Sequence, residues 1–158
     1  MSSKIISELE VSPSNRVSRR DEQPLEPTRV EHTAISSSGE WMATIDEREA
    51  DDTFRGEIYL KIWWWEGKTN RWILNTRIDR PHGLKKVLAM AFSPEIAGHS
   101  NLNLVTTGRD GNVKMWSVRR AKKKNEHSEG SWSLSKSTVL NRLFCSVLDL
   151  SLDFWISF

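Results

Sequence analysis

From residue 29 onward, short apolar runs alternate with breaks of Gly, Ser, Asn and Asp. The runs are roughly four to nine residues long, are rich in β-branched and aromatic residues, and show no sustained helical period. Such runs favour strands joined by turns. We therefore expect an all-β, antiparallel fold, with strands at residues 30–35, 40–46, 57–65, 71–78, 87–94, 102–108, 112–118 and 131–137.

The second half of this pattern repeats the first. "AISSSGEWMATI" corresponds to "AFSPEIAGHSNLNLVTT", "LKIW" to "VKMW", and "RWIL" to "SWSL". A four-stranded unit that recurs after roughly fifty residues is typical of β-propeller blades of the WD40 or kelch type. Only two blades are evident, so we expect an incomplete propeller.

The same pattern sets the expected domain boundaries. They are a disordered or extended lead-in at 1–28, a first blade at 29–79, a second blade at 80–137, and an apolar tail at 138–158. Within the lead-in, a short strand near 5–11 is an alternative. The tail alternates apolar and polar residues and could add a strand. Charged residues interrupt it, which argues against a membrane-spanning helix. Because no further blade follows, we expect a truncated product whose end is not homologous to the rest.

The second unit distinguishes between the propeller families. "LVTTGRDGNVKMWSV", at 104–118, resembles the end of a WD40 repeat, in which a small polar strand meets an Asp-Gly turn and then a strand ending in Trp. The Asp-Gly pair suits a tight hairpin because it tolerates positive φ. In WD40 repeats a His, a Ser or Thr, an Asp and a Trp form a hydrogen-bonded tetrad. The resemblance implies this role for His82, Thr106, Asp110 and Trp116.

The chain departs from the WD40 pattern at several positions. Pro81 stands where a Gly precedes the His, and Ser117 stands where the Trp-Asp dipeptide has its Asp. In the first unit Trp64 takes that position, and "EREADDTFRG" replaces the turn that carries the Asp. We therefore expect a degenerate first blade without a tetrad, in which Trp63 is the blade tryptophan.

Three longer stretches narrow the resemblance. "SSSGEWMATIDERE", "EIYLKIWWWEGKTNRWILNTRIDRPHG" and "LVTTGRDGNVKMWSV" together resemble the WD-repeat subunits of the UtpA (t-Utp) subcomplex of the small-subunit processome. The acidic loop and "LNTRIDRPHG" are the most discriminating parts. The resemblance implies a nucleolar, non-enzymatic scaffold in pre-ribosomal RNA transcription and processing. Its implied partners are other WD-repeat subunits and pre-rRNA or U3 small nucleolar RNA, without a cofactor, membrane or small-molecule substrate. The alternative is a general WD40 adaptor outside the nucleolus.

The tryptophans of "KIWWWEGKTNRWIL" invite a functional interpretation. Because blades pack on blades, a third strand can be apolar on both faces, so we assign Trp63 and Trp64 to blade packing. Trp65, at the strand end, is the candidate for a partner contact. "GKT" at 67–69 resembles a phosphate loop, but Ile62 stands where the first Gly is needed and a strand follows. We predict a hairpin turn there.

One basic run follows the second blade's third strand. "RRAKKKN" supplies five basic side chains, namely Arg119, Arg120, Lys122, Lys123 and Lys124. They could contact RNA phosphates without sequence specificity, or serve nuclear import. A solvated loop is the alternative, and the sequence leaves both interpretations open.

Composition excludes several other classes. The 158 residues carry a net charge of +2, too small to argue for nucleic acid by itself, and the single cysteine, Cys145, rules out an internal disulfide. The acidic stretch 46–52 lacks the spacing of a calcium loop and should be solvated. The histidines have no zinc spacing. We expect no catalytic, cofactor or metal site.

Overall fold

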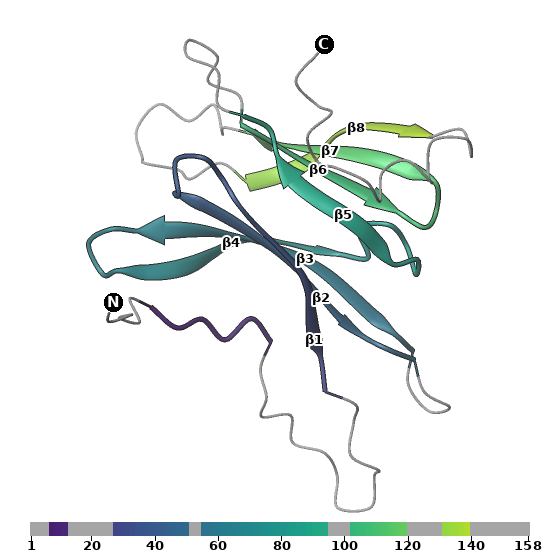
Figure 1. The fold of residues 1–158 in the computed structure, drawn as a ribbon, viewed down its shortest axis with the longest axis horizontal. Helices are drawn as coiled ribbons and strands as arrows, with labels where there is room; N and C mark the ends of the chain where they lie inside the picture. Colours follow the sequence, from purple (N-terminus) through teal and green to yellow (C-terminus); the bar gives the residue numbers. More distant parts are fainter. Residues whose placement is uncertain (1–6, 13–26, 51–54, 95–101, 120–130, 140–158) are drawn as a thin grey trace, which may run out of the picture.

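The computed structural model describes residues 7–12, 27–50, 55–94, 102–119 and 131–139. Eight strands lie in these ranges and no helix does. They are β1 (Arg29–Ile35), β2 (Trp41–Arg48), β3 (Glu57–Glu66), β4 (Arg71–Asp79), β5 (Val87–Phe92), β6 (Asn103–Gly108), β7 (Asn112–Arg119) and β8 (Ser131–Val139). They form two four-stranded antiparallel sheets, ordered β1-β2-β3-β4 and β5-β6-β7-β8 (Figure 1). The predicted all-β fold with two open blades is confirmed.

Turn chemistry sets the strand pairing within each sheet. Gly111 has a φ of 76° in the β6–β7 turn, where its amide donates to the Gly108 carbonyl at 3.0 Å. Asn70 has a φ of 51° in the β3–β4 turn, a conformation that Asn tolerates better than most residues. In that turn the Thr69 hydroxyl donates to Glu66 at 2.5 Å. The "GKT" stretch is therefore a hairpin turn, as predicted.

The repeat extends to the irregularities of the sheets. The pairing of β1 with β2 shifts register between Val30 and His32, and that of β5 with β6 shifts between Val87 and Ala89. Likewise, the last two strands of each sheet shift register just before the blade tryptophan, Trp63 or Trp116. The register shifts thus fall at equivalent positions of the two sheets, where a bulge bends its strand. Residues of the two blades can therefore be compared position by position.

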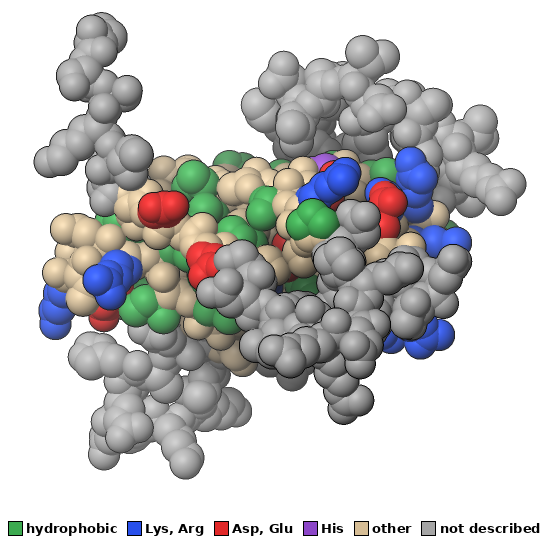
Figure 2. Space-filling view, turned by 90° about the horizontal axis from the view of Figure 1, so that it is seen from below, with side chains coloured by type: hydrophobic (Ala, Val, Ile, Leu, Met, Phe, Trp, Pro, Cys, Tyr) green, Lys and Arg blue, Asp and Glu red, His purple; other side chains and the backbone are tan. Residues whose placement is uncertain are grey.

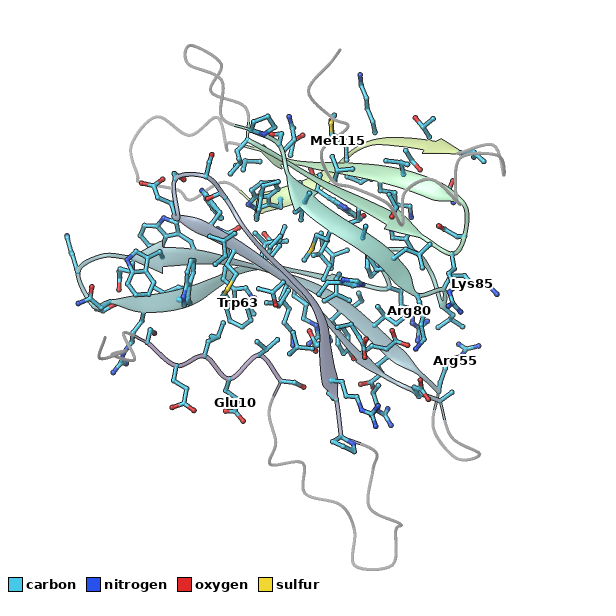
Figure 3. All side chains as sticks on the ribbon, viewed as in Figure 1. Glu10, Arg55, Trp63, Arg80, Lys85 and Met115 are labelled. Carbon is cyan, nitrogen blue, oxygen red and sulfur yellow. The ribbon has the colours of Figure 1, made fainter. Side chains whose placement is uncertain are left out.

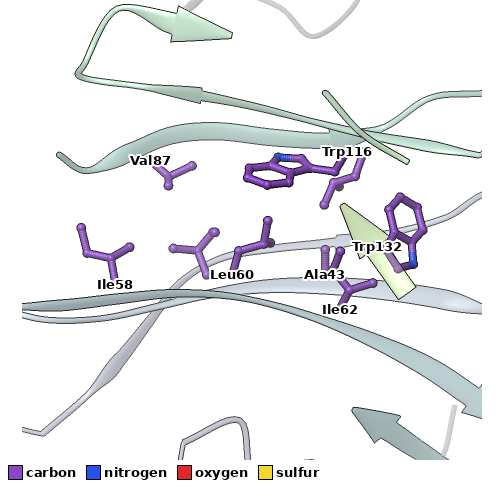
Figure 4. Close-up of a cluster of buried hydrophobic side chains, with 9 residues drawn as sticks. Ala43, Ile58, Leu60, Ile62, Val87, Trp116 and Trp132 are labelled. Atoms are coloured by element: carbon purple, nitrogen blue, oxygen red, sulfur yellow. The ribbon is translucent and has the colours of Figure 1, made fainter. Parts of the chain in front are cut away.

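The hydrophobic core lies between the two sheets (Figure 4). Alternation along the strands places Ala43 and Leu60 on the side of the first sheet that faces the second sheet. Leu104 and Trp116 face them from the second sheet, and the remaining core members are Ile45, Ile58, Ile62, Val87 and Trp132. The face of the first sheet that carries Ala43 and Leu60 thus packs on the face of the second sheet that carries Leu104 and Trp116.

Polar and aromatic contacts tie the two sheets together at several points. The Trp132 ring makes an edge-to-face contact with Trp41 of the first sheet at 5.5 Å, and it also contacts Phe92 of its own sheet at 5.9 Å. Its backbone amide donates to the Thr76 hydroxyl at 3.0 Å. Near the other end, the Lys86 ammonium lies 3.3 Å from Glu47. These contacts fix the position of one blade on the other.

Several strand limits differ by a few residues from the sequence-based expectation, and the acidic stretch differs in its surroundings. The acidic stretch at 46–52 was expected to be a solvated loop, but β2 continues to Arg48, and Asp46, Glu47 and Arg48 are buried. Asp46 can be buried because its carboxylate pairs with Lys61, which is also buried, on the neighbouring strand. Within the lead-in, residues 7–12 form no strand. The alternative of an extra strand in the tail concerns residues 140–158, which lie outside the described ranges.

Truncating a side chain between the sheets should destabilise both blades. Leu60→Ala leaves a cavity at a fully buried position and should lower the free energy of unfolding by about 2–5 kcal/mol. Urea unfolding followed by tryptophan fluorescence measures the effect. The matched control is Val139→Ala, at a side chain that is 72% exposed, which should stay within about 0.5 kcal/mol of wild type. Equal effects of the two substitutions would contradict this packing.

Candidate functional site

A network of four hydrogen-bonded polar side chains lies inside the second blade. His82 comes from the segment between β4 and β5, Thr106 from β6, Asp110 from the β6–β7 turn, and Trp116 from β7. The His82 ring bonds Asp110 at 2.8 Å through Nδ1 and Thr106 at 2.9 Å through Nε2. The Trp116 indole N–H donates to the same Thr106 hydroxyl at 3.0 Å. The structure thus brings together the four residues that the sequence singled out.

Local backbone geometry makes room for this network. A Cβ built on Gly108 would come within 2.4 Å of the His82 ring, so a glycine at this position lets the ring lie against the strand. Asp110 also accepts from the Asn112 amide at 3.1 Å and from the Asn112 side chain at 2.8 Å. The turn and the network therefore depend on the same carboxylate.

Burial determines the protonation of the network. It lowers the pKa of His82, although the neighbouring Asp110 opposes this shift. Burial also acts to raise the pKa of Asp110, but hydrogen bonds from Asn112 and His82 outweigh it and hold that pKa below its usual range. A neutral ring can donate from Nδ1 to Asp110 and accept the Thr106 hydroxyl at Nε2. Every buried polar group of the tetrad is then satisfied.

The first blade keeps only part of this arrangement. The Trp63 indole N–H donates to the Thr44 hydroxyl at 3.0 Å, as Trp116 does to Thr106. At the position equivalent to Gly108 the first blade has Asp46, whose carboxylate bonds the Lys61 ammonium at 2.8 Å. Burial raises the pKa of Asp46, against the opposing effect of Lys61. Sequence analysis missed this pair.

The three consecutive tryptophans have different surroundings. Trp63 is buried, whereas Trp64 and Trp65 are half-buried. The Trp65 ring makes an edge-to-face contact with Trp72 at 5.1 Å. Trp72 and Trp132 occupy equivalent register positions, but only Trp132 is packed between the sheets. Trp65 therefore keeps part of its surface available, at the end of the first blade.

Other predicted site residues lie partly or wholly outside the described ranges. Arg119 ends β7, and the rest of the basic run, Arg120, Lys122, Lys123 and Lys124, falls in the undescribed residues 120–130. Within the described part of the chain no three His, Cys, Asp or Glu side chains gather as metal ligands. No helix in those ranges is long and apolar enough to cross a membrane.

Removing the shared hydroxyl should destabilise the second blade. Thr106→Val keeps the side-chain shape but leaves the Trp116 N–H and the His82 ring nitrogen without their common partner. Each buried group left unpaired costs about 1–3 kcal/mol, so unfolding in urea should shift clearly. Thr107→Val, the next residue along the strand and on its opposite face, is the control and should change stability by less than about 0.5 kcal/mol. If Thr107→Val costs as much as Thr106→Val, the network does not support the blade.

The lowered pKa of His82 predicts a pH dependence of stability. The unfolded chain binds a proton at His82 near pH 6.5, whereas the folded chain resists protonation. The stabilisation is therefore present at neutral pH and is lost as the pH falls below about 6.5. Unfolding free energies at about pH 7.5 and 5.5 should differ more for wild type than for His82→Gln. Equal differences would show that His82 does not carry the effect.

Comparison with known proteins agrees with this geometry. A family model described as "WD repeat-containing protein 75 second beta-propeller" matches residues 8–141. WD repeat-containing protein 75 of Xenopus laevis is 37% identical over 87 residues, which is 52% of this chain and 10% of the relative. Its counterpart in Mus musculus is 31% identical over 96 residues, or 61% and 11%. U3 small nucleolar RNA-associated protein 17 of Schizosaccharomyces pombe is 31% identical over 106 residues, or 62% and 12%.

The chain spans about a tenth of the length of these curated relatives. The family match covers both sheets, the whole tetrad and the Asp46–Lys61 pair. The chain therefore belongs to the family of the second β-propeller of WD repeat-containing protein 75.

Proposed function

We propose that this chain is a non-enzymatic WD40 scaffold that acts in ribosome biogenesis, in the nucleolus. The observation that carries the proposal is the family match over residues 8–141 together with a relative named for its association with U3 small nucleolar RNA. On this proposal, its partners are other WD-repeat subunits and pre-rRNA or U3 RNA, held directly or through those subunits.

The chemistry of the described site supports a scaffold. His82 and Thr106 are 2% and 0% exposed, so neither can meet a substrate in the folded blade. Their bonds connect the segment before β5, strand β6, the β6–β7 turn and strand β7, which is a stabilising role. The tetrad thus holds the blade surface in shape for other molecules to bind.

The aromatic pair at the end of the first blade and the basic run of the sequence are candidates for those contacts. Figure 2 shows basic and acidic side chains interspersed with apolar ones on the uncovered part of one face. The half-buried Trp65 and Trp72 at the end of the first blade would provide an aromatic contact. The basic run at 119–124 would contact RNA phosphates.

Recovery of U3 RNA with a tagged form of the full chain tests the proposal. Purification from nucleolar extract should enrich U3 RNA and pre-rRNA over an unrelated spliceosomal RNA. Trp65→Ala should reduce recovery of protein subunits, and alanine at the five basic positions should reduce RNA recovery in a salt-dependent way. Val139→Ala serves as the matched control. A chain that binds proteins only outside the nucleolus, without U3 RNA, would support the general adaptor and contradict the proposal.

A further inference from the structure

Residues 7–12 lie on the side of the first sheet that faces away from the second (Figures 1 and 3). Their contact with the blade is specific, because the Lys61 ammonium donates to the Val11 carbonyl at 2.6 Å. Met42, Thr44 and Trp63, on the same face as Lys61, are all less than 9% exposed. The segment thus contacts this largely buried face of the first sheet through the buried Lys61 ammonium.

The second blade holds its entering segment in the same way. Lys114 occupies the position equivalent to Lys61, since the two lysines pair with Thr106 and Thr44 and each precedes its blade tryptophan by two residues. The Lys114 ammonium donates to the Pro81 carbonyl at 2.7 Å. Pro81 lies in the segment between β4 and β5, whereas Val11 lies earlier in the chain than β1 and is separated from it by the undescribed residues 13–26. In each blade one lysine contacts the backbone of a segment that precedes the blade's first strand.

The two blades differ in what surrounds this lysine. In the second blade the His82 ring, next to Pro81, lies against Gly108. In the first blade the equivalent of Gly108 is Asp46, whose side chain is fully buried and bonds Lys61 at 2.8 Å. The Asp46 carboxylate of β2 thus lies at the position where the second blade accommodates the His82 ring from the segment before β5. The Lys61 ammonium also lies 5.6 Å from the centre of the Tyr59 ring.

A buried charge needs partners of this kind. An ammonium removed from water is tolerated when a carboxylate and further acceptors surround it, and losing one partner of such a pair is costly. Lys61 uses one bond for Asp46 and another for Val11. The carboxylate therefore holds the Lys61 side chain toward the segment, and the Val11 carbonyl accepts a second hydrogen bond from it.

We propose that the Asp46–Lys61 pair is the anchoring site for residues 7–12 on the first blade, where it replaces the histidine-centred network of the second. The occupant is this chain's own N-terminal segment, bound through its backbone. The family match begins at residue 8, within this segment, which agrees with a segment that belongs to the propeller. Lys114 performs the corresponding contact for the segment that contains His82.

Native-state proteolysis of the full chain tests the anchor. A glutamate-specific protease can cut after Glu8 and Glu10 in the segment, and after Glu40 in the β1–β2 turn as an internal reference. Cleavage from the native state reports how often a segment opens. Lys61→Met removes a charge-assisted hydrogen bond to the segment, so cleavage after Glu8 and Glu10 should rise about tenfold or more. Cleavage after Glu40, which reports the cost of the unpaired Asp46 to the whole sheet, should rise less.

Two further variants make the result specific. Asp46→Asn keeps the size of the side chain and removes its charge, and it should also increase cleavage in the segment. Lys114→Met, the matched control in the second blade, should leave cleavage after Glu8 and Glu10 at the wild-type rate. The proposal is overturned if Lys61→Met leaves these sites unchanged, if Glu40 accelerates equally because the whole chain has opened, or if Lys114→Met has the same effect as Lys61→Met.

Discussion

The apolar layer between the two sheets is the constraint on which the rest of the structure depends. Neither four-stranded sheet can bury both faces alone, and Leu60, Ile62, Leu104 and Trp116 are buried where one sheet packs on the other. The polar residues on the second sheet's inner face are removed from water by the same contact. His82 and Thr106 must then find partners inside the protein, because an unpaired buried group is costly. The tetrad follows from the packing, and burial lowers the pKa of His82.

The two blades satisfy the same requirement by different chemistry. Both keep a threonine that accepts from the blade tryptophan, and both keep a lysine that contacts the incoming backbone. The second blade adds a neutral histidine ring, for which Gly108 leaves the space. The first blade adds the Asp46 carboxylate at that position and forms an ion pair instead. The two blades therefore keep the same strand arrangement although their buried polar interactions at equivalent positions differ.

Much of this could be predicted from the sequence. Alternation and turn residues located the eight strands, and the resemblance of "LVTTGRDGNVKMWSV" to the end of a WD40 repeat implied the tetrad residues. Asp46 was misjudged because "DEREADD" has the composition of a solvated loop, and composition does not show that a lysine lies on the next strand. One signal was present, since "LKIW" and "VKMW" carry their lysine at the same position. The placement of residues 7–12 could not be predicted, because its contact is made through a backbone carbonyl.

Amide hydrogen exchange of the full chain tests most directly whether the two sheets form one cooperative unit. The central strands β2, β3, β6 and β7 should show the highest protection, at similar opening free energies, because each sheet is stable only against the other. Leu60→Ala, in the first sheet, should lower the protection of β6 and β7 as much as that of β2 and β3. Protection of β6 and β7 that does not respond to Leu60→Ala would mean that the second blade is stable by itself, and would contradict this account.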